Sequence, residues 1–346
     1  MRVLITGASG FIGRNLLLQA PAHWQVTAVY HRDRTFASFV RARQAHGIRA
    51  VACDLASPRE VARLAARVGR SFDTLIYLAG HVDPGRSVEV PLSDLQANTI
   101  ALLNTLEYFR AGRCIFFSSG AVYEGLRGSV SPRSPVSPTL PYAIAKVAGE
   151  QYVKFYTLRR RHMGRYVILR FFGAFGPHEP SRKIYTRLVQ AFGLEGHDAF
   201  TIRGDGTNQI DAMYVDDAVH GLLRVVQQRA VGNVTVDFAN ARPLTIRALV
   251  ERAARTFGRA RVRLRCAGPT QEALHCRASR HTMLRQFGFA PRIRLEDGLQ
   301  RLAEFLRQSS TCRRETPGCP RAGGSTPGGG AREGAPGGRT RRMFSA

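Results

Sequence analysis

The chain has 346 residues, of which 44% are hydrophobic and 22% charged, as in a soluble globular protein able to bury one large or two modest cores. No apolar run approaches the ~20 residues of a membrane-spanning helix, and the first strand-like run begins too near the start to follow a signal peptide. The formal net charge of +26 is spread over every segment without a clustered basic stripe, so an arginine-rich solvated surface that attracts anionic small molecules is favoured over nucleic-acid binding.

Short β-branched or aromatic runs alternate with longer helical patterns from residue 1 to about 172. Strands are predicted at 2–6, 25–30, 49–52, 74–78, 114–118 and 166–172, and helices at 11–20, 58–69, 91–110 and 142–162. This alternation predicts an α/β fold with a Rossmann-type, doubly wound parallel sheet covered by helices on both faces.

The pattern loosens beyond residue 172 into helices with a few strands, at 235–238 and 261–265, before a final helix at 295–307. We expect residues 1–172, with part of 205–240, to form a cofactor-binding domain. A smaller C-terminal α/β substrate lobe is expected from residues 173–204 and 240–307. From about Gln308 the sequence is rich in Arg, Gly and Pro, so residues 308–346 are expected to be a disordered tail.

A glycine-rich loop follows the first predicted strand and opens the first predicted helix. It reads Gly7-Ala8-Ser9-Gly10-Phe11-Ile12-Gly13. Glycines permit a tight turn that brings backbone N–H groups to a pyrophosphate, which the N-terminus of a helix attracts electrostatically. We therefore expect Gly7, Ser9, Gly10, Phe11, Ile12 and Gly13 to bind a dinucleotide. The loop resembles that of the extended short-chain dehydrogenase/reductase family.

A Tyr-x-x-x-Lys pair, Tyr142 and Lys146, opens the helix predicted at 142–162. Residues four apart share one helix face, and a nearby ammonium favours the phenolate that a tyrosine needs to accept a proton. The strand that ends in Ser118-Ser119 and is followed by Val122-Tyr123 is similar to the family's strand carrying a catalytic hydroxyl. The resemblance implies that Ser119, Tyr142 and Lys146 are the catalytic residues.

Further positions are expected to contact the cofactor. The second strand is followed by His31 and Arg32 where an NAD-binding protein usually carries an acid, and arginine suits a 2′-phosphate. NADP is therefore favoured, with NAD possible. The resemblance adds Asp54 and Leu55 after the third strand, although Asp54 is also explained as a helix-capping turn residue. Leu78, Ala79 and Gly80 are expected beside the nicotinamide, and Asn98 matches a family asparagine.

The resemblance covers residues 1–307 and is strongest to sugar-nucleotide epimerases and reductases of the NAD-dependent epimerase/dehydratase type. It implies substrate contacts at His81, Ser119, Gly120, Gly173, Arg182 and Arg203. Gly120 and Ala121 replace the Asp–Glu pair of the family's dehydratases, so dehydration is not expected. Two departures weaken the sugar-nucleotide interpretation: Gly173 replaces a common substrate-contacting asparagine, and Ile210 replaces an arginine that often holds the nucleotide pyrophosphate. Arg182, Lys183, Arg187 or Arg203 could substitute for that arginine.

The predicted function is hydride-transfer chemistry on a nucleotide-activated sugar, by C4 epimerisation or 4-keto reduction, in a cytoplasmic homodimer. The alternatives are an NADP-dependent reductase of a non-nucleotide carbonyl or alcohol, and a cofactor sensor without turnover. The intact Ser119, Tyr142 and Lys146 set stands against the sensor, because a sensor needs only the glycine loop. The six cysteines form no C-x-x-C pair, so no metal site is expected.

Overall fold

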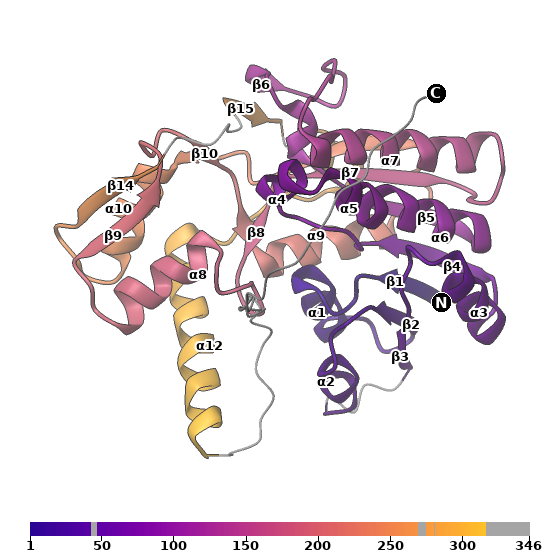
Figure 1. Cartoon of the computed structure of the whole chain (residues 1–346), viewed down its shortest axis with the longest axis horizontal. Helices are drawn as coiled ribbons and strands as arrows, with labels where there is room; N and C mark the ends of the chain where they lie inside the picture. The colour runs from indigo at the N-terminus through magenta and orange to yellow at the C-terminus, as the bar shows by residue number, and fades with distance from the viewer. Residues whose placement is uncertain (43–46, 269–274, 280, 316–346) are drawn as a thin grey trace, which may run out of the picture.

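A seven-stranded parallel sheet forms the centre of the larger half of the molecule, which we call the cofactor-side half (Figure 1). The computed structural model describes residues 1–42, 47–268, 275–279 and 281–315. The seven strands lie in the order β12 (Val234–Phe238), β7 (Tyr166–Phe171), β5 (Arg110–Ser119), β4 (Ser71–Tyr77), β1 (Arg2–Thr6), β2 (Gln25–Tyr30) and β3 (Ile48–Ala52). The predicted Rossmann-type fold is confirmed.

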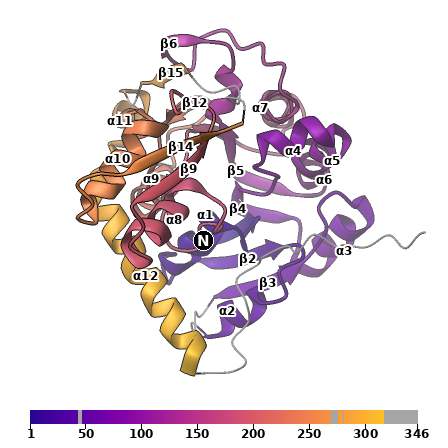
Figure 2. The same cartoon turned by 60° about the vertical axis from the view of Figure 1, so that its left-hand side comes forward.

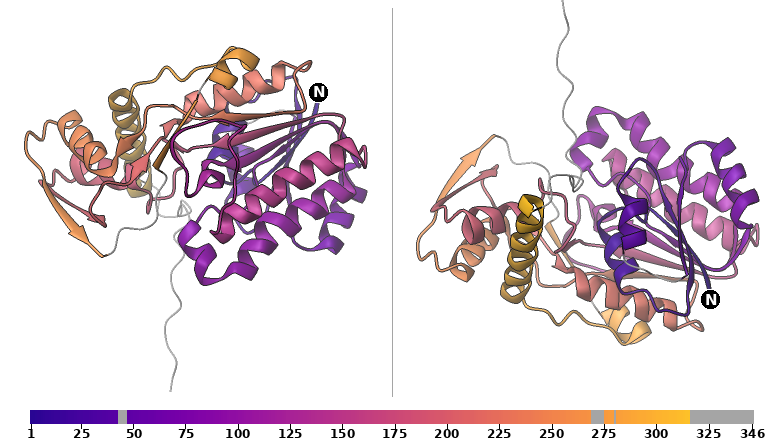
Figure 3. Two further views of the ribbon diagram at one scale, coloured as in Figure 1. Left: turned by 90° about the horizontal axis from the view of Figure 1, so that it is seen from above. Right: turned by 90° about the horizontal axis from the view of Figure 1, so that it is seen from below.

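Both faces of the sheet are buried, because successive strand residues point to opposite sides. In β1, Val3 and Ile5 pack in one apolar cluster and Leu4 packs in the other. Helices α1 (Phe11–Leu18) and α9 (Val215–Gln227) cover the first face, and α3 (Pro58–Val68), α6 (Ala101–Tyr108) and α7 (Pro141–Leu158) cover the second. Figure 3 shows the sheet between these two layers.

The helix predicted at 91–110 is divided into three. It consists of α5 (Pro91–Leu95), a π-helical segment η1 (Gln96–Ile100) and α6, and a short helix α4 (Pro84–Glu89) precedes it. A π-helical segment carries its hydrogen bonds one residue further than an α-helix, so it changes the direction of the side chains that follow. Hydrophobic periodicity alone does not reveal such a break. Helix α2 (Phe36–Ala42) was also missed.

The second half of the molecule lies beyond the carboxyl ends of the strands (Figure 2). It contains α8 (Ile184–Leu188), the π-helical η3 (Val189–Leu194), α10 (Ile246–Thr256) and α12 (Leu295–Glu315) beside the paired strands β9 (Ala199–Arg203) and β14 (Arg263–Ala267). Three further strand pairs link the halves: β8 (Ala174–Phe175) with β11 (Met213–Tyr214), β10 (Gln209–Ile210) with β13 (Leu244–Thr245), and β6 (Arg127–Val130) with β15 (His275–Ala278).

The chain returns to the sheet before its final helix. Helix α11 (His281–Phe287) lies against β12, and the Phe289 ring is 5.8 Å from that of Phe238 at the end of that strand. The segment from α11 to Phe289, which lies between β14 and α12, thus packs against the edge strand of the seven-stranded sheet.

The last helix is longer than predicted. Helix α12 continues to Glu315, eight residues beyond the predicted end of the helix at residue 307. These eight residues contain neither glycine nor proline, and the helix therefore propagates until Thr316-Pro317, beyond which glycine and proline accumulate. The rest of the predicted tail, residues 316–346, lies outside the described residues.

Candidate active site

The glycine loop joins the end of β1 to the start of α1. Gly7 has φ +66°, and a Cβ at this position would lie 2.7 Å from the backbone nitrogen of Ala79, so the ends of β1 and β4 approach as only glycine allows. Gly10 is the N-cap residue of α1, and no side chain caps that helix end. Gly13 is held against the backbone of Gly7 and Ala8, where a Cβ would meet both carbonyl oxygens at 2.6 Å. A bare helix N-terminus behind a tight turn fits a pyrophosphate.

Polar groups gather where β2 and β3 end. His31 Nε2 lies 3.7 Å from a carboxylate oxygen of Asp54, because the two strands are paired neighbours. Asp54 also accepts a hydrogen bond from the backbone N–H of Ala56 at 3.0 Å, so it serves the turn as well. Both His31 and Arg32 are exposed.

The acid that follows them, Asp33, is already paired. Its carboxylate receives hydrogen bonds from Arg14 at 2.6 Å and from the Thr35 hydroxyl at 2.7 Å. Burial alone would raise the pKa of Asp33, but the bonds from Thr35 and Arg14 hold it below its ordinary value. Arg14 is in turn held over the Phe39 ring, 4.5 Å from its centroid. Arg14 was not singled out from the sequence.

The segment after β4, residues 78–81, lies next to Asn98 and Lys146. Leu78 and Ala79 are half-buried, whereas Gly80 and His81 are exposed. Gly80 has φ +150°, and a Cβ there would lie 2.3 Å from Asn98 Oδ1 and 3.5 Å from Lys146 Nζ.

The three predicted catalytic residues come together beside this segment. Ser119 is the last residue of β5, and Tyr142 and Lys146 lie one turn apart at the start of α7. Proline at the first position of α7 fixes where that helix begins. The Ser119 side chain lies near enough to the Tyr142 hydroxyl to lower its pKa, while Lys146 Nζ donates to the carbonyl oxygen of Phe117 at 3.2 Å and lies 5.7 Å from the Tyr142 ring centroid.

Burial sets the ionisation of this group. It raises the pKa of Tyr142 to about 12, an effect that the Ser119 side chain opposes. It lowers the pKa of Lys146 to about 8, and the attraction of Asp94 opposes that shift. Both shifts disfavour the charged form, which is the expected sign of desolvation.

The predicted substrate positions are more dispersed. Gly120 packs against the Phe172 ring, which a Cβ would meet at 2.9 Å, and Gly173 has φ +131° beside Ala212. Ile210 is half-buried in β10, opposite Leu244.

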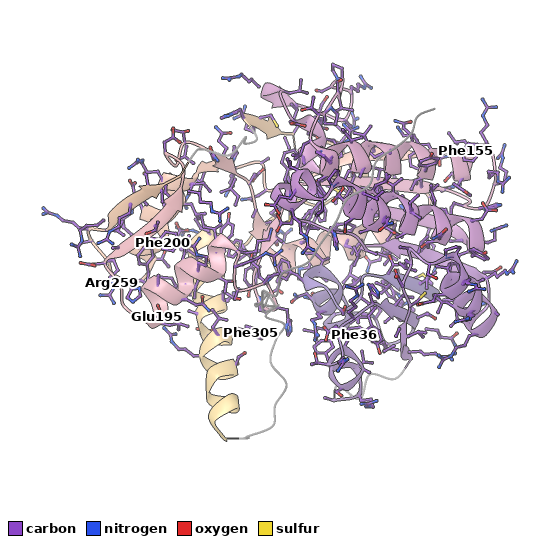
Figure 4. The ribbon with its side chains drawn as sticks, viewed as in Figure 1. Phe36, Phe155, Glu195, Phe200, Arg259 and Phe305 are labelled. Carbon is purple, nitrogen blue, oxygen red and sulfur yellow. The ribbon has the colours of Figure 1, made fainter. Side chains whose placement is uncertain are left out.

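The candidate cations lie in different places. Arg182 Nη2 is 3.7 Å from Asp83 at the start of α4, and the Arg182 side chain is largely exposed. Arg203 is an exposed residue at the end of β9, and Lys183 is the N-cap of α8. Arg187 is engaged within the lobe, since its guanidinium lies 4.9 Å from the Phe200 ring centroid. Figure 4 shows Phe200 in that part of the lobe.

A buried polar network under the site was missed. Arg170 binds both carboxylate oxygens of Glu150, at 3.0 and 2.8 Å, and its third nitrogen donates to the Tyr123 hydroxyl. That hydroxyl donates to Asp237 at 2.6 Å, and Ser118 donates to Glu150 at 2.6 Å. The network ties the ends of β5, β7 and β12 to α7. Its sequence signal is a charged residue within an apolar strand run, as at Arg170 and Asp237.

A known protein family matches most of the chain. The model of the family described as "NAD dependent epimerase/dehydratase family" matches residues 3–238. Within the described residues, no helix is long and apolar enough to cross a membrane.

Several relatives extend the match over most of the chain. A dTDP-glucose 4,6-dehydratase of Streptomyces niveus is 25% identical, over 89% of this chain and 94% of its own length. A UDP-glucose 4-epimerase of Mycolicibacterium smegmatis is 26% identical, over 90% of this chain and all of its own. The solved structure of MoeE5 in complex with UDP-glucose and NAD superposes with a TM-score of 0.78 at 25% identity, covering 90% of this chain and 100% of that one.

Proposed function

This chain belongs to the NAD dependent epimerase/dehydratase family, and from that premise we propose that it catalyses hydride-transfer chemistry on a nucleotide-activated sugar. The proposed reaction is C4 epimerisation or 4-keto reduction. The observation that carries it is the placement of Ser119 and Lys146 beside the Tyr142 side chain, at the strand ends that also form the glycine loop. Such a set performs acid–base chemistry on an alcohol or carbonyl oxygen.

Each residue has a definite role in this proposal. Tyr142 exchanges a proton with the reacting oxygen of the substrate, and the Ser119 hydroxyl holds that oxygen by a hydrogen bond. The Lys146 ammonium favours the tyrosine phenolate, which burial alone disfavours. A bound nicotinamide would supply the hydride acceptor or donor, and the loop of Gly7, Gly10 and Gly13 would hold its pyrophosphate.

The sugar-nucleotide substrate is proposed from the relatives, which are named for acting on dTDP- and UDP-sugars. Loss of water is not part of the proposal, because Gly120 and Ala121 provide no carboxylate for it. We place the substrate against His81, Ser119, Gly120 and Gly173, with Arg182 and Arg203 as candidate partners for its phosphates. We keep the division proposed from the sequence, with a cofactor domain and a substrate lobe of residues 173–204 and 240–307. In that division, His81, Ser119 and Gly120 belong to the cofactor domain, and Gly173, Arg182 and Arg203 belong to the lobe.

A second candidate rests on Ile210 and Gly173. A half-buried apolar side chain and a glycine stand where the family holds the substrate with an arginine and an asparagine. These two positions favour an NADP-dependent reductase of a non-nucleotide carbonyl or alcohol. Mass spectrometry of small molecules that purify with the protein separates the two candidates. A bound nucleoside diphosphate sugar supports the first, whereas a dinucleotide together with turnover of simple carbonyls and no affinity for sugar nucleotides supports the second.

The family's cofactor is NAD, and for this chain we propose a preference for NADP. An acid at the end of β2 normally accepts bonds from the adenosine ribose. Here Asp33 is neutralised by Arg14, and Arg32 and Arg34 are exposed beside it. Positive groups next to a neutralised acid favour a 2′-phosphate over a free hydroxyl.

We also propose that the protein is a cytoplasmic homodimer. Exposed apolar side chains gather on α5, η1 and α7, and Figure 4 shows Phe155 at the outer side of α7; the others are Leu92, Leu95, Ile100, Ile144 and Tyr152. Such a face is typical of an interface between subunits. Light scattering should report twice the chain mass, and Leu95→Glu should shift the measured mass toward that of the monomer.

The proposed cytoplasmic location rests on the cysteines. The four described cysteines are free thiols, which suits a reducing compartment, and a fluorescent fusion tests the location.

A further inference from the structure

A buried carboxylate next to the proposed catalytic residues has no role in the chemistry above. Asp94 on α5 is only 3% exposed, and its Oδ1 accepts a hydrogen bond from Asn98 Nδ2 at 2.8 Å. Its other oxygen, Oδ2, is buried and has no hydrogen-bond partner among the residues that the structure describes. Leaving a charged oxygen buried and unpaired is costly, so an ionised Asp94 requires a positive charge close by.

His81 and Lys146 both lower the pKa of Asp94, and Lys146 is the one of the two that is buried beside it. Its side chain is 5% exposed, and it shares a neighbourhood with the residue that binds Asp94. The amide nitrogen of Asn98 donates to Asp94, and a Cβ on the adjacent Gly80 would meet both Asn98 Oδ1, at 2.3 Å, and Lys146 Nζ, at 3.5 Å. Asn98 Oδ1 is itself buried without a hydrogen-bond partner among the described residues. Burial lowers the pKa of Lys146 and raises that of Asp94, and the attraction between the two groups opposes both shifts. Each charge therefore stabilises the other.

Other titratable groups surround the pair from three sides. His81 after β4 and Asp83 and Arg86 of α4 line, together with Asp94, a cavity of about 10 Å³, which is the space of about one water molecule. His81 and Arg86 are exposed and Asp83 is half-buried, so solvent weakens their fields. On α7, burial raises the pKa of Tyr142, and the charge of Asp94 adds to that shift. Asp94 is the buried acid in this group.

We propose that Asp94 is a positioning residue that acts through Lys146, its carboxylate being the counter-charge that keeps the ammonium in place and protonated beside Tyr142. The importance of that ammonium rests on the proposed function, but the pairing itself does not depend on turnover. Without Asp94, the lysine would lose its proton at lower pH. It would then no longer favour the tyrosine phenolate, and the active range would lose its alkaline side.

The experiment titrates Lys146 directly. The chain has three lysines, Lys146, Lys154 and Lys183, so protein labelled with ¹³C-lysine gives three side-chain signals. Lys154→Arg and Lys183→Arg assign them. In Asp94→Asn, which keeps size and shape, we expect the pKa of Lys146 to fall by about one unit or more. An unchanged value would overturn the inference.

A matched control removes the neighbouring acid instead. Asp83→Asn deletes a carboxylate from the same cavity but should leave the Lys146 titration unchanged, and an equal shift in both variants would show a general field effect and contradict the proposal. If Asp94→Asn fails to fold, the smaller Asp94→Ser serves, with folding checked by thermal melting.

Activity provides the second readout. The alkaline limb of the kcat/KM profile should move down in Asp94→Asn by the same amount as the Lys146 pKa, while activity at pH values well below the shifted limb stays close to wild type. A uniform loss at every pH would contradict a role through Lys146. The two proposals can fail separately: a shifted lysine without any turnover sinks the proposed function alone, and normal turnover with an unshifted lysine sinks this inference alone.

Discussion

The strand ends of the sheet and the lobe beyond them differ in how closely they follow the family. At the strand ends, the glycine loop, Ser119, Tyr142 and Lys146 are all present and lie together. On the lobe side, Gly173 and Ile210 stand where the family resemblance implies polar substrate contacts. Chemistry at the cofactor constrains geometry to tenths of an ångström, whereas recognition of a substrate can be redistributed among surface residues. The reaction class is therefore easier to infer than the substrate.

The strongest test of the strand-end half is Tyr142→Phe. It removes the hydroxyl that we propose exchanges a proton with the substrate but keeps the buried ring, so turnover should fall by about 10² or more while the fold and cofactor binding remain. Steady-state kinetics and cofactor titration check the two parts. Wild-type turnover would refute the catalytic assignment.

The second test concerns the glycine loop. Even a Cβ at Gly10 would lie 3.2 Å from the Gly7 carbonyl oxygen, and the branches of valine would also cover the N-terminus of α1. Overpacking costs about 1–3 kcal/mol, so Gly10→Val should weaken cofactor binding by roughly tenfold to a hundredfold. Calorimetry measures the dissociation constant. An unchanged constant would mean that the loop does not approach a pyrophosphate.

The third test separates the two dinucleotides. Replacing Arg32 and Arg34 by alanine together should weaken NADP by about tenfold or more, as for the loss of a charge-assisted hydrogen bond, and leave NAD nearly unchanged. Equal losses for both cofactors would indicate only a general field. A wild-type protein that prefers NAD would overturn the proposed preference.

A smaller effect is expected on the lobe side. Arg182 is largely exposed, so Arg182→Ala should raise KM for a sugar nucleotide by only about fivefold, with kcat within a factor of two. Arg63→Ala, at an exposed arginine of α3, is the matched control for net charge. If the two variants behave alike, Arg182 does not contact the substrate. The lobe would then differ from the family at a further position, while the strand ends keep the family's residues.

The smallest effect should come from the C-terminus. The sequence of residues 316–346 is rich in Gly, Pro and Arg and offers few apolar side chains that could pack on the folded chain. Truncation after Glu315 should leave the melting temperature and turnover nearly unchanged. A drop of several degrees would show that this segment stabilises the folded chain.

The parts that were predicted from the sequence depend on local patterns. Strand and helix periods placed β1, β2, β12 and α1 within a few residues, and the order of glycine loop, serine and Tyr-x-x-x-Lys located the site. What was missed depends on tertiary contacts. The π-helical turn at Asn98, the Arg14–Asp33 pair and the position of Asp94 arise from packing between segments far apart in the chain, and no local period encodes them.

The position of β12 at the edge of the sheet has a consequence for synthesis of the protein. β12 pairs with β7, yet about sixty residues of chain, including α8 and β9, are made between them. During translation, β7 therefore emerges with an open edge, and α9 is not yet available to cover its apolar face. Closing so long a loop is slow relative to local folding. The nascent chain should consequently depend on chaperones most strongly between the emergence of residues 171 and 238.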